Sequence, residues 1–193
     1  MVTSFFDKWL SAETYGLVPQ VTSKGNVYRV RKSGADMQER ADLLEEVDTR
    51  ARQLVKELVA NHSNKCYTSI LSTRYGKVQL YEADPDSELT AYTTEKRSIA
   101  LCLRRIKGDV TSPLVDSNTL MYVLVHEMAH LGIDHQGHVP EFWDAFKEIA
   151  RVAVAIGVLQ YVDYSKKNEQ YCAMPITGNI QDATGNGTSF TIP

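Results

Sequence analysis

A run of six apolar residues, Leu120-Met121-Tyr122-Val123-Leu124-Val125, leads directly into His126-Glu127-Met128-Ala129-His130. On a helix, residues four apart lie on one face, so His126 and His130 can direct two imidazoles to one point. Glu127 adds a carboxylate beside them. Neutral nitrogen ligands, an open coordination position and a nearby base are what a catalytic zinc site requires. The stretch therefore predicts a buried helix that carries His126 and His130 as metal ligands and Glu127 as a base.

The histidines are concentrated around this motif. Four of the 5 histidines of the chain lie between residues 126 and 138. The alternative is a surface helix with two unrelated histidines, but the preceding apolar run argues against an exposed helix. Because a catalytic zinc takes three protein ligands, a third ligand must be sought elsewhere in the chain.

His135 and His138 are the candidates for that third ligand. A metzincin would place the ligand at position 136, which is Gln136, and its glycine one residue later than Gly132. We favour His138 over His135. His138 directly precedes a helix predicted to begin at Pro140, and a ligand held by a helix loses less conformational entropy on binding than one in a free loop.

A glutamate ligand from the second helix, Glu141 or Glu148, is a less favoured alternative. Glu141 lies close to His138 in sequence and is as readily explained as a surface carboxylate or one that supports a ligand. Phe142 and Trp143 are suited to anchor the second helix against the first.

The rest of the chain predicts an α+β fold with a small antiparallel or mixed sheet packed on the motif helix. One long helix precedes the motif helix and one helix follows it. The expected helices cover 36–61, from Asp116 or Ser117 to Gly132, and 140–156. The expected strands cover 26–31, 67–71, 78–81, 98–104, 158–164 and 171–176.

Several local features refine this outline. Asp36 followed by Glu39 resembles a capping box, and the charged face of the first helix is expected to be solvated. Gly132 can end the motif helix in a left-handed conformation. Ile99, Leu101 and Leu103 fall on one face of their strand, which is typical of an antiparallel edge strand. The adjacent basic cluster, Arg104, Arg105 and Lys107, is interpreted as a solvated loop rather than a nucleic-acid contact.

The length of 193 residues suits one domain over 1–193, with a segment at 1–25 that is hard to assign and a flexible tail over 178–193. A short aromatic turn at 5–10 is the only pattern near the start. A net charge of −3 argues against binding of DNA by the whole surface. A local basic groove that contacts DNA is still compatible with this net charge. The pattern of the chain does not indicate an oligomeric state.

No signal-peptide layout or membrane-length apolar run is present in the sequence, so we expect an intracellular protein of the cytoplasm or nucleus that is neither secreted nor membrane-bound. The three cysteines, Cys66, Cys102 and Cys172, have no paired spacing. They are expected to be free buried thiols in a reducing compartment.

The motif, a loop, and then His138-x-x-x-Phe142-Trp143 together resemble the zinc peptidases of the WLM and SprT-like (Spartan-type) group. The resemblance covers about 95–160, and the wider chain is similar to WLM-type proteins encoded by large DNA viruses. The loop between His130 and His138 is less compact than in the cellular WLM pattern. The resemblance implies a zincin-like fold, a Zn²⁺ cofactor, cleavage of protein or peptide substrates, some of them crosslinked to DNA, and a location in the host cell or the virion.

The expected mechanism is hydrolysis of a peptide bond, with Glu127 as the base and His126, His130 and His138 as ligands. Tyr161, Tyr164 and Tyr171 are candidate oxyanion donors, although packing roles explain each of them as well. The substrate is expected to add as a strand along 98–104. Two alternatives stay open: a zinc-stabilised binding or virion protein without activity, and hydrolysis of a bond other than a peptide bond.

Overall fold

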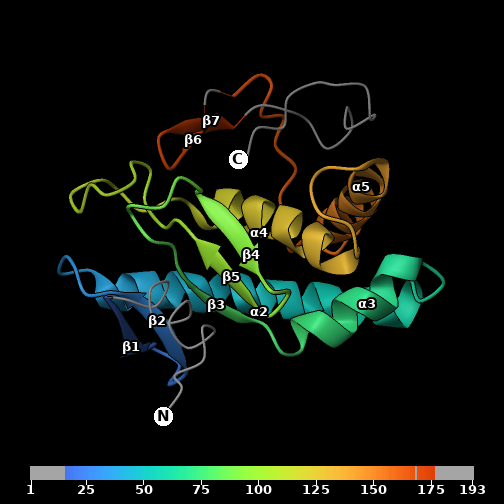
Figure 1. Ribbon diagram of the computed structural model, residues 1–193, viewed down its shortest axis with the longest axis horizontal. Coiled ribbons are helices and arrows are strands. Elements are labelled where there is room, and N and C mark those ends of the chain that lie inside the picture. The colour runs from blue at the N-terminus through green and yellow to red at the C-terminus, as the bar shows by residue number, and fades with distance from the viewer. Residues whose placement is uncertain (1–15, 168, 177–193) are drawn as a thin grey trace, which may run out of the picture.

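The computed structural model describes residues 16–167 and 169–176, which form four helices and seven strands (Figure 1). The helices are α2 (Met37–Asn61), α3 (Cys66–Tyr75), α4 (Ser117–Gly132) and α5 (Pro140–Ala155). The strands are β1 (Leu17–Val21), β2 (Val27–Arg31), β3 (Gln79–Glu82), β4 (Ala91–Thr94), β5 (Ser98–Leu101), β6 (Glu169–Tyr171) and β7 (Met174–Ile176). The expected α+β class is confirmed. The aromatic turn at 5–10 and the tail at 178–193 lie outside the described residues.

Five strands form a mixed sheet in the order β1-β2-β3-β5-β4. β1 pairs antiparallel with β2, and β4 antiparallel with β5, whereas β3 runs parallel to both β2 and β5. β6 and β7 form a separate hairpin. The sheet is therefore mixed, and two of its strands, β1 and β4, were not predicted from the sequence.

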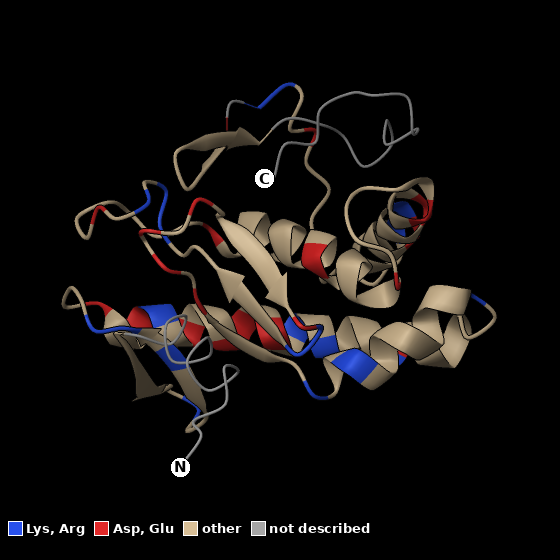
Figure 2. Cartoon of the chain, viewed as in Figure 1, with Lys and Arg blue, Asp and Glu red and all other residues tan. Residues whose placement is uncertain are grey.

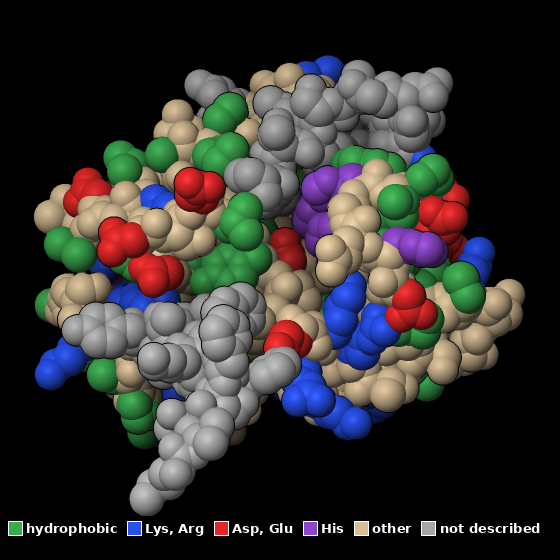
Figure 3. Space-filling model, in the orientation of Figure 1, with side chains coloured by type: hydrophobic (Ala, Val, Ile, Leu, Met, Phe, Trp, Pro, Cys, Tyr) green, Lys and Arg blue, Asp and Glu red, His purple; other side chains and the backbone are tan. Residues whose placement is uncertain are grey.

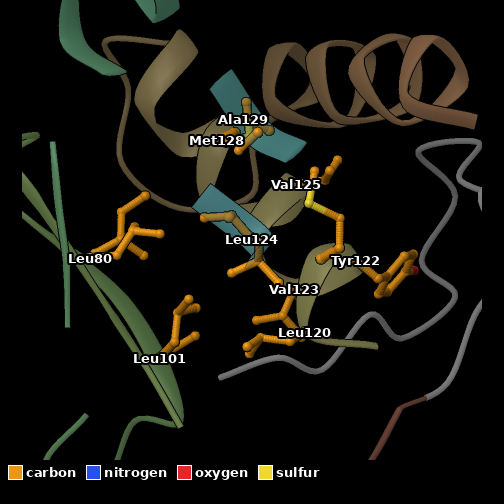
Figure 4. Close-up of a cluster of buried hydrophobic side chains, with 14 of the residues drawn as sticks. Leu80, Leu101, Leu120, Tyr122, Val123, Leu124, Val125, Met128 and Ala129 are labelled. Carbon is orange, nitrogen blue, oxygen red and sulfur yellow. The ribbon is translucent and has the colours of Figure 1, made fainter. Parts of the chain in front are cut away.

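Helix α4 lies at the centre of the fold, behind the strands in the view of Figure 1. It packs against α2, α3 and α5 and against strands β4 and β5. Figure 4 shows Leu120 and Leu124 on the side of α4 that faces Leu80 of β3 and Leu101 of β5, while Tyr122 points away from them. A helix that is apolar all round is stable only when it is surrounded in this way. The predicted burial of the motif helix is confirmed.

Helix α2 matches its predicted range, but two expectations about its polar residues are wrong. Asp36 makes no side-chain cap bond and instead accepts bonds from Arg104 and Arg40, so the capping box does not form. Arg40 is 0% exposed and pairs with Glu82 of β3. The charged face of α2, which carries both signs of charge in Figure 2, is therefore partly buried in ion pairs rather than fully solvated.

The segment predicted as a strand at 67–71 is instead part of helix α3. Its buried residues Tyr67, Leu71 and Tyr75 recur every four residues, which suits a helix packed against α4. The helices approach closely at Gly132, where an added Cβ would lie 3.2 Å from Cβ of Tyr67. Gly132 accordingly lies within α4, which is capped at Ile133, and the expected left-handed end at Gly132 is wrong.

Strand β5 is shorter than predicted and is not an edge strand. It pairs with β3 on one side and β4 on the other, and Ile99, Ala100 and Leu101 are all fully buried. The expected strand at 158–164 is also wrong. That segment has no strand, and Arg50 of α2 donates a hydrogen bond to the carbonyl of Val158 within it.

The cysteines differ from the expectation of three free buried thiols. Cys102, just after β5, forms a disulfide with Cys172, in the turn between β6 and β7, and the Cα atoms are 6.2 Å apart. Cys66 is free but exposed. The hairpin is therefore tied covalently to the sheet, a pairing that spacing in the sequence did not indicate.

The basic cluster after β5 is not a solvated loop throughout. Arg104 is buried and donates to Asp36 and to the carbonyl of Ser112. Lys107 donates to the carbonyls of Ser87 and Leu89, and only Arg105 is well exposed. In the described part of the chain, no helix has the length and apolar character needed to cross a membrane.

Candidate metal centre

The N-terminus of α4 is fixed by Asp116, as predicted. Its carboxylate accepts hydrogen bonds from the backbone N–H of Thr119 at 2.9 Å and from the Thr119 hydroxyl at 2.6 Å. This satisfies one of the orphan donors of the first turn. The helix then passes through the core, and Glu127 is the single charged side chain within Ser117–Gly132. The helix thus presents the motif residues at its C-terminal half, where α5 begins to cover it.

Three imidazoles meet at this end of α4. His126 and His130 come from α4, and His138 precedes the first residue of α5. One nitrogen of each ring lies within 4.8 Å of the others, and the Nε2 atoms of His126 and His138 are 3.0 Å apart. His126 is buried, His130 is half-buried and His138 is exposed. Figure 3 shows histidine side chains at the surface beside α4 and α5, so the cluster opens to solvent on this face.

The structure brings His138, and not His135, to the pair on α4. His135 is exposed in the connecting loop and is not part of the cluster. Neither glutamate alternative joins the cluster: Glu141 is exposed, and Glu148 faces Lys65 at 3.5 Å and Arg151 at 3.9 Å. Among the described residues, the three histidines are the group with metal-ligand geometry.

Phe142 holds the three imidazoles in place. Its buried ring lies 4.8 Å from the ring of His126, 4.3 Å from His130 and 4.7 Å from His138, measured between centroids. Trp143 stacks on His138 at 5.4 Å. The two aromatic residues therefore restrict the rotamers of the histidines before any ligand binds, which lowers the entropy lost on binding.

Burial keeps the imidazoles neutral. Removal from water lowers the pKa of His126 well below its usual range, and the neighbouring His130 and His138 lower it further. Burial, with smaller contributions from His138 and Lys96, lowers the pKa of His130 to about 4. Although His138 is exposed as a residue, partial removal of its ring from water also lowers its pKa. Neutral imidazole has the free lone pair that a metal ligand needs.

Glu127 is 4% exposed and lies next to this cluster on α4. Its Oε2 accepts a hydrogen bond of 2.8 Å from the hydroxyl of Thr93 on β4. Burial raises the pKa of Glu127 to about 7, although the Thr93 bond and the charge of Lys96 act in the opposite direction. A carboxyl group with a pKa near neutrality can both accept and return a proton at physiological pH.

Two cations secure the C-terminal end of α4. Arg74 of α3 donates to the carbonyls of Leu131 at 2.8 Å and Ile133 at 2.9 Å and pairs with Asp134. Lys96, in the turn between β4 and β5, donates to the carbonyl of His130. Reasoning from the sequence missed Thr93 and Lys96 because β4 itself was not predicted. The run of β-favouring residues Tyr92-Thr93-Thr94 was the signal that could have revealed it.

Two of the three candidate tyrosines, Tyr171 and Tyr164, have their hydroxyls in other contacts. The hydroxyl of Tyr171 accepts from the backbone N–H of Cys102 at 2.9 Å and donates to the carbonyl of Thr90 at 3.2 Å. Tyr164 lies near Thr119, close to the opposite end of α4, and Tyr161 is exposed in the segment after α5. Packing, which the sequence left open as an alternative, accounts for the positions of the buried Tyr164 and Tyr171.

The chain is similar to proteins of large DNA viruses. It is 29% identical over 181 residues to an uncharacterized protein of Acanthamoeba polyphaga mimivirus, a match that covers 91% of this chain and 89% of the relative. It is 32% identical over 111 residues to an uncharacterized protein of Invertebrate iridescent virus 6, covering 57% of this chain and 60% of the relative. A third such protein, from Invertebrate iridescent virus 3, is 33% identical over 85 residues, which is 44% of this chain and 50% of the relative.

No model of a known protein family matches the sequence. No solved structure matches it either.

Proposed function

We propose that this chain is a zinc-dependent peptidase whose zinc ligands are His126, His130 and His138. The observation that carries the proposal is the convergence of three imidazole nitrogens within 4.8 Å beside a buried glutamate. Nitrogen ligands of a tetrahedral zinc, each at about 2.0–2.1 Å, lie about 3.3 Å from one another. The separation of 3.0 Å between two of the nitrogens is close to this value, and the donor set suits zinc.

The mixed sheet packed on the motif helix supports a zincin-like assignment of the fold. When bound, zinc would polarise the scissile carbonyl and lower the pKa of a coordinated water to about 7. Glu127 would take the proton from the attacking water and pass it to the leaving amine. The raised pKa of Glu127 suits both transfers. Purely structural zinc sites are fully ligated by the protein and need no such base, so Glu127 favours catalysis over a zinc-stabilised scaffold.

The path of the substrate proposed from the sequence needs correction, because β5 is paired on both sides and cannot accept another strand. β4 ends the described sheet, and its Thr93 contacts Glu127. We therefore place an extended peptide along the edge of β4 that no described strand covers, where backbone hydrogen bonds would hold it beside the base.

The test compares the zinc content and the proteolytic activity of the wild type with those of three variants. Glu127→Gln should keep zinc and lose cleavage of a generic protein such as casein. His138→Ala should lose most of its zinc. His135→Ala, three positions away and exposed, is the matched control and should keep both zinc and activity.

Each assay is run with and without DNA, because the proteins that the motif resembles include enzymes that cleave DNA-crosslinked proteins. A fully active Glu127→Gln variant would falsify the mechanism. A wild type that binds zinc but cleaves no substrate would favour the zinc-stabilised structural protein instead.

A further inference from the structure

The hairpin of β4 and β5 contacts the motif helix at two positions one turn apart. Thr93 of β4 donates to Oε2 of Glu127 at 2.8 Å. Lys96, in the hairpin turn, donates through Nζ to the backbone carbonyl of His130. Within residues 16–167 and 169–176, the hydroxyl of Thr93 supplies the side-chain hydrogen bond that the buried carboxylate of Glu127 receives. The hairpin thus reaches both the base and the backbone of a proposed ligand.

The turn of this hairpin has an unfavourable backbone. Glu95 and Lys96 both adopt left-handed conformations, with φ of 48° and 58°, and the N–H of Arg97 bonds to the carbonyl of Thr94 at 2.9 Å. Turns of this kind favour asparagine and glycine, because a side chain clashes with its own backbone at positive φ. Such strain persists only where surrounding contacts hold it. The bond from Lys96 to His130 is one such contact, and it keeps the hairpin seated on α4.

We propose that Thr93 is a positioning residue for Glu127, an inference that depends on the proposed peptidase function. By donating to Oε2, Thr93 fixes the plane of the carboxylate and leaves Oε1 to accept the proton from the attacking water. Without this bond the carboxylate could rotate away from the three histidines. A misplacement of about 1 Å in a reacting group can reduce a rate by about 100-fold.

The contact also couples the base to the proposed substrate strand. Thr93 lies on β4, one of the two end strands of the sheet that the described residues form. A peptide that pairs with β4 would hold this strand against α4, and the hydroxyl of Thr93 would then be held against Glu127. Because Thr93 acts through Glu127, its loss is expected to lower kcat rather than to raise KM.

The experiment uses Thr93→Val, which removes the hydroxyl and nearly preserves the shape, and Thr93→Ser, which restores a hydroxyl. Thr49→Val, at an exposed threonine of α2, is the control for the same substitution elsewhere. Steady-state kinetics on one peptide substrate, zinc content and thermal unfolding are measured for each protein. If Thr93→Val does not fold, Thr93→Ala is used in its place.

Thr93→Val should retain zinc and its unfolding temperature, lose about 10- to 100-fold in kcat, and keep KM within about 2-fold. Thr93→Ser should recover most of the rate, and Thr49→Val should match the wild type. A Thr93→Val protein with unchanged kcat, alongside an inactive Glu127→Gln, would overturn the role of Thr93 and leave the peptidase proposal intact. A parallel loss of zinc or of folding with activity would also overturn it, because it would make Thr93 a structural residue. An active Glu127→Gln protein would overturn the peptidase mechanism itself.

Discussion

Replacing both Cys102 and Cys172 with serine is expected to destabilise the protein substantially without changing its fold. The two cysteines are 70 residues apart in sequence, and for a loop of this length the chain-entropy relation gives a loss of about 4 kcal/mol at 25 °C. The effect acts mainly on the unfolded chain, which gains freedom when the crosslink is removed. Native contacts of the hairpin remain, including the bonds of the Tyr171 hydroxyl and the bond of 2.6 Å from the N–H of Ala173 to the carbonyl of Arg105.

The assay is urea unfolding followed by circular dichroism, without reductant. With an m-value of about 2 kcal/mol/M, a loss of 4 kcal/mol lowers the midpoint by about 2 M. Cys66→Ser is the control and should change the midpoint little, because Cys66 is exposed and free. Reductant should shift the wild type toward the double variant. Three titratable thiols in the native protein under non-reducing conditions, instead of one, would refute the reasoning.

Three further predictions concern the core and the site. Phe142→Ala should lower the free energy of unfolding by about 3–5 kcal/mol and weaken zinc retention, since the Phe142 ring packs on all three histidines. Zinc retention is measured as the metal content after dialysis against a weak chelator, and unchanged retention would contradict the packing argument. Arg40→Met should lower the free energy of unfolding in urea by about 3–5 kcal/mol, because Glu82 stays buried without its ion-pair partner. Adding Glu82→Leu should recover part of this stability. A double variant no more stable than Arg40→Met would argue against a stabilising Arg40–Glu82 ion pair. Asp116→Ala should cost about 1 kcal/mol through loss of the cap on α4. Although burial raises the pKa of Asp116, bonds from Thr119 outweigh it and lower the pKa overall, so the contribution is present above the unfolded pKa of about 3.9 and is lost as the pH falls through the folded value. The difference in free energy of unfolding between the wild type and Asp116→Ala should therefore be smaller in acid than at neutral pH. An equal difference at both pH values would exclude the carboxylate as the cap.

Sequence reasoning succeeded where structure depends on near neighbours. The ranges of α2, α4 and α5 were predicted closely because their apolar residues repeat at helical spacing and Asp116 and Pro140 are typical helix starts. It failed where packing overrides local preference. Residues 67–71 have aromatic and β-branched side chains that favour a strand, yet they form α3 because Tyr67 packs closely against Gly132 of α4.

The candidate site likewise has a part that the sequence predicts and a part that depends on tertiary packing. The spacing of His126, Glu127 and His130 on one helix was determined by the sequence alone, because residues four apart on a helix share a face whatever surrounds them. The tertiary structure decided the rest. It brought His138 rather than His135 to the pair, set Thr93 against Glu127, and joined Cys102 to Cys172. These contacts join residues that are distant in sequence, up to 70 residues apart for the two cysteines. Such residues come together only when the core packs, because bringing them together costs chain entropy.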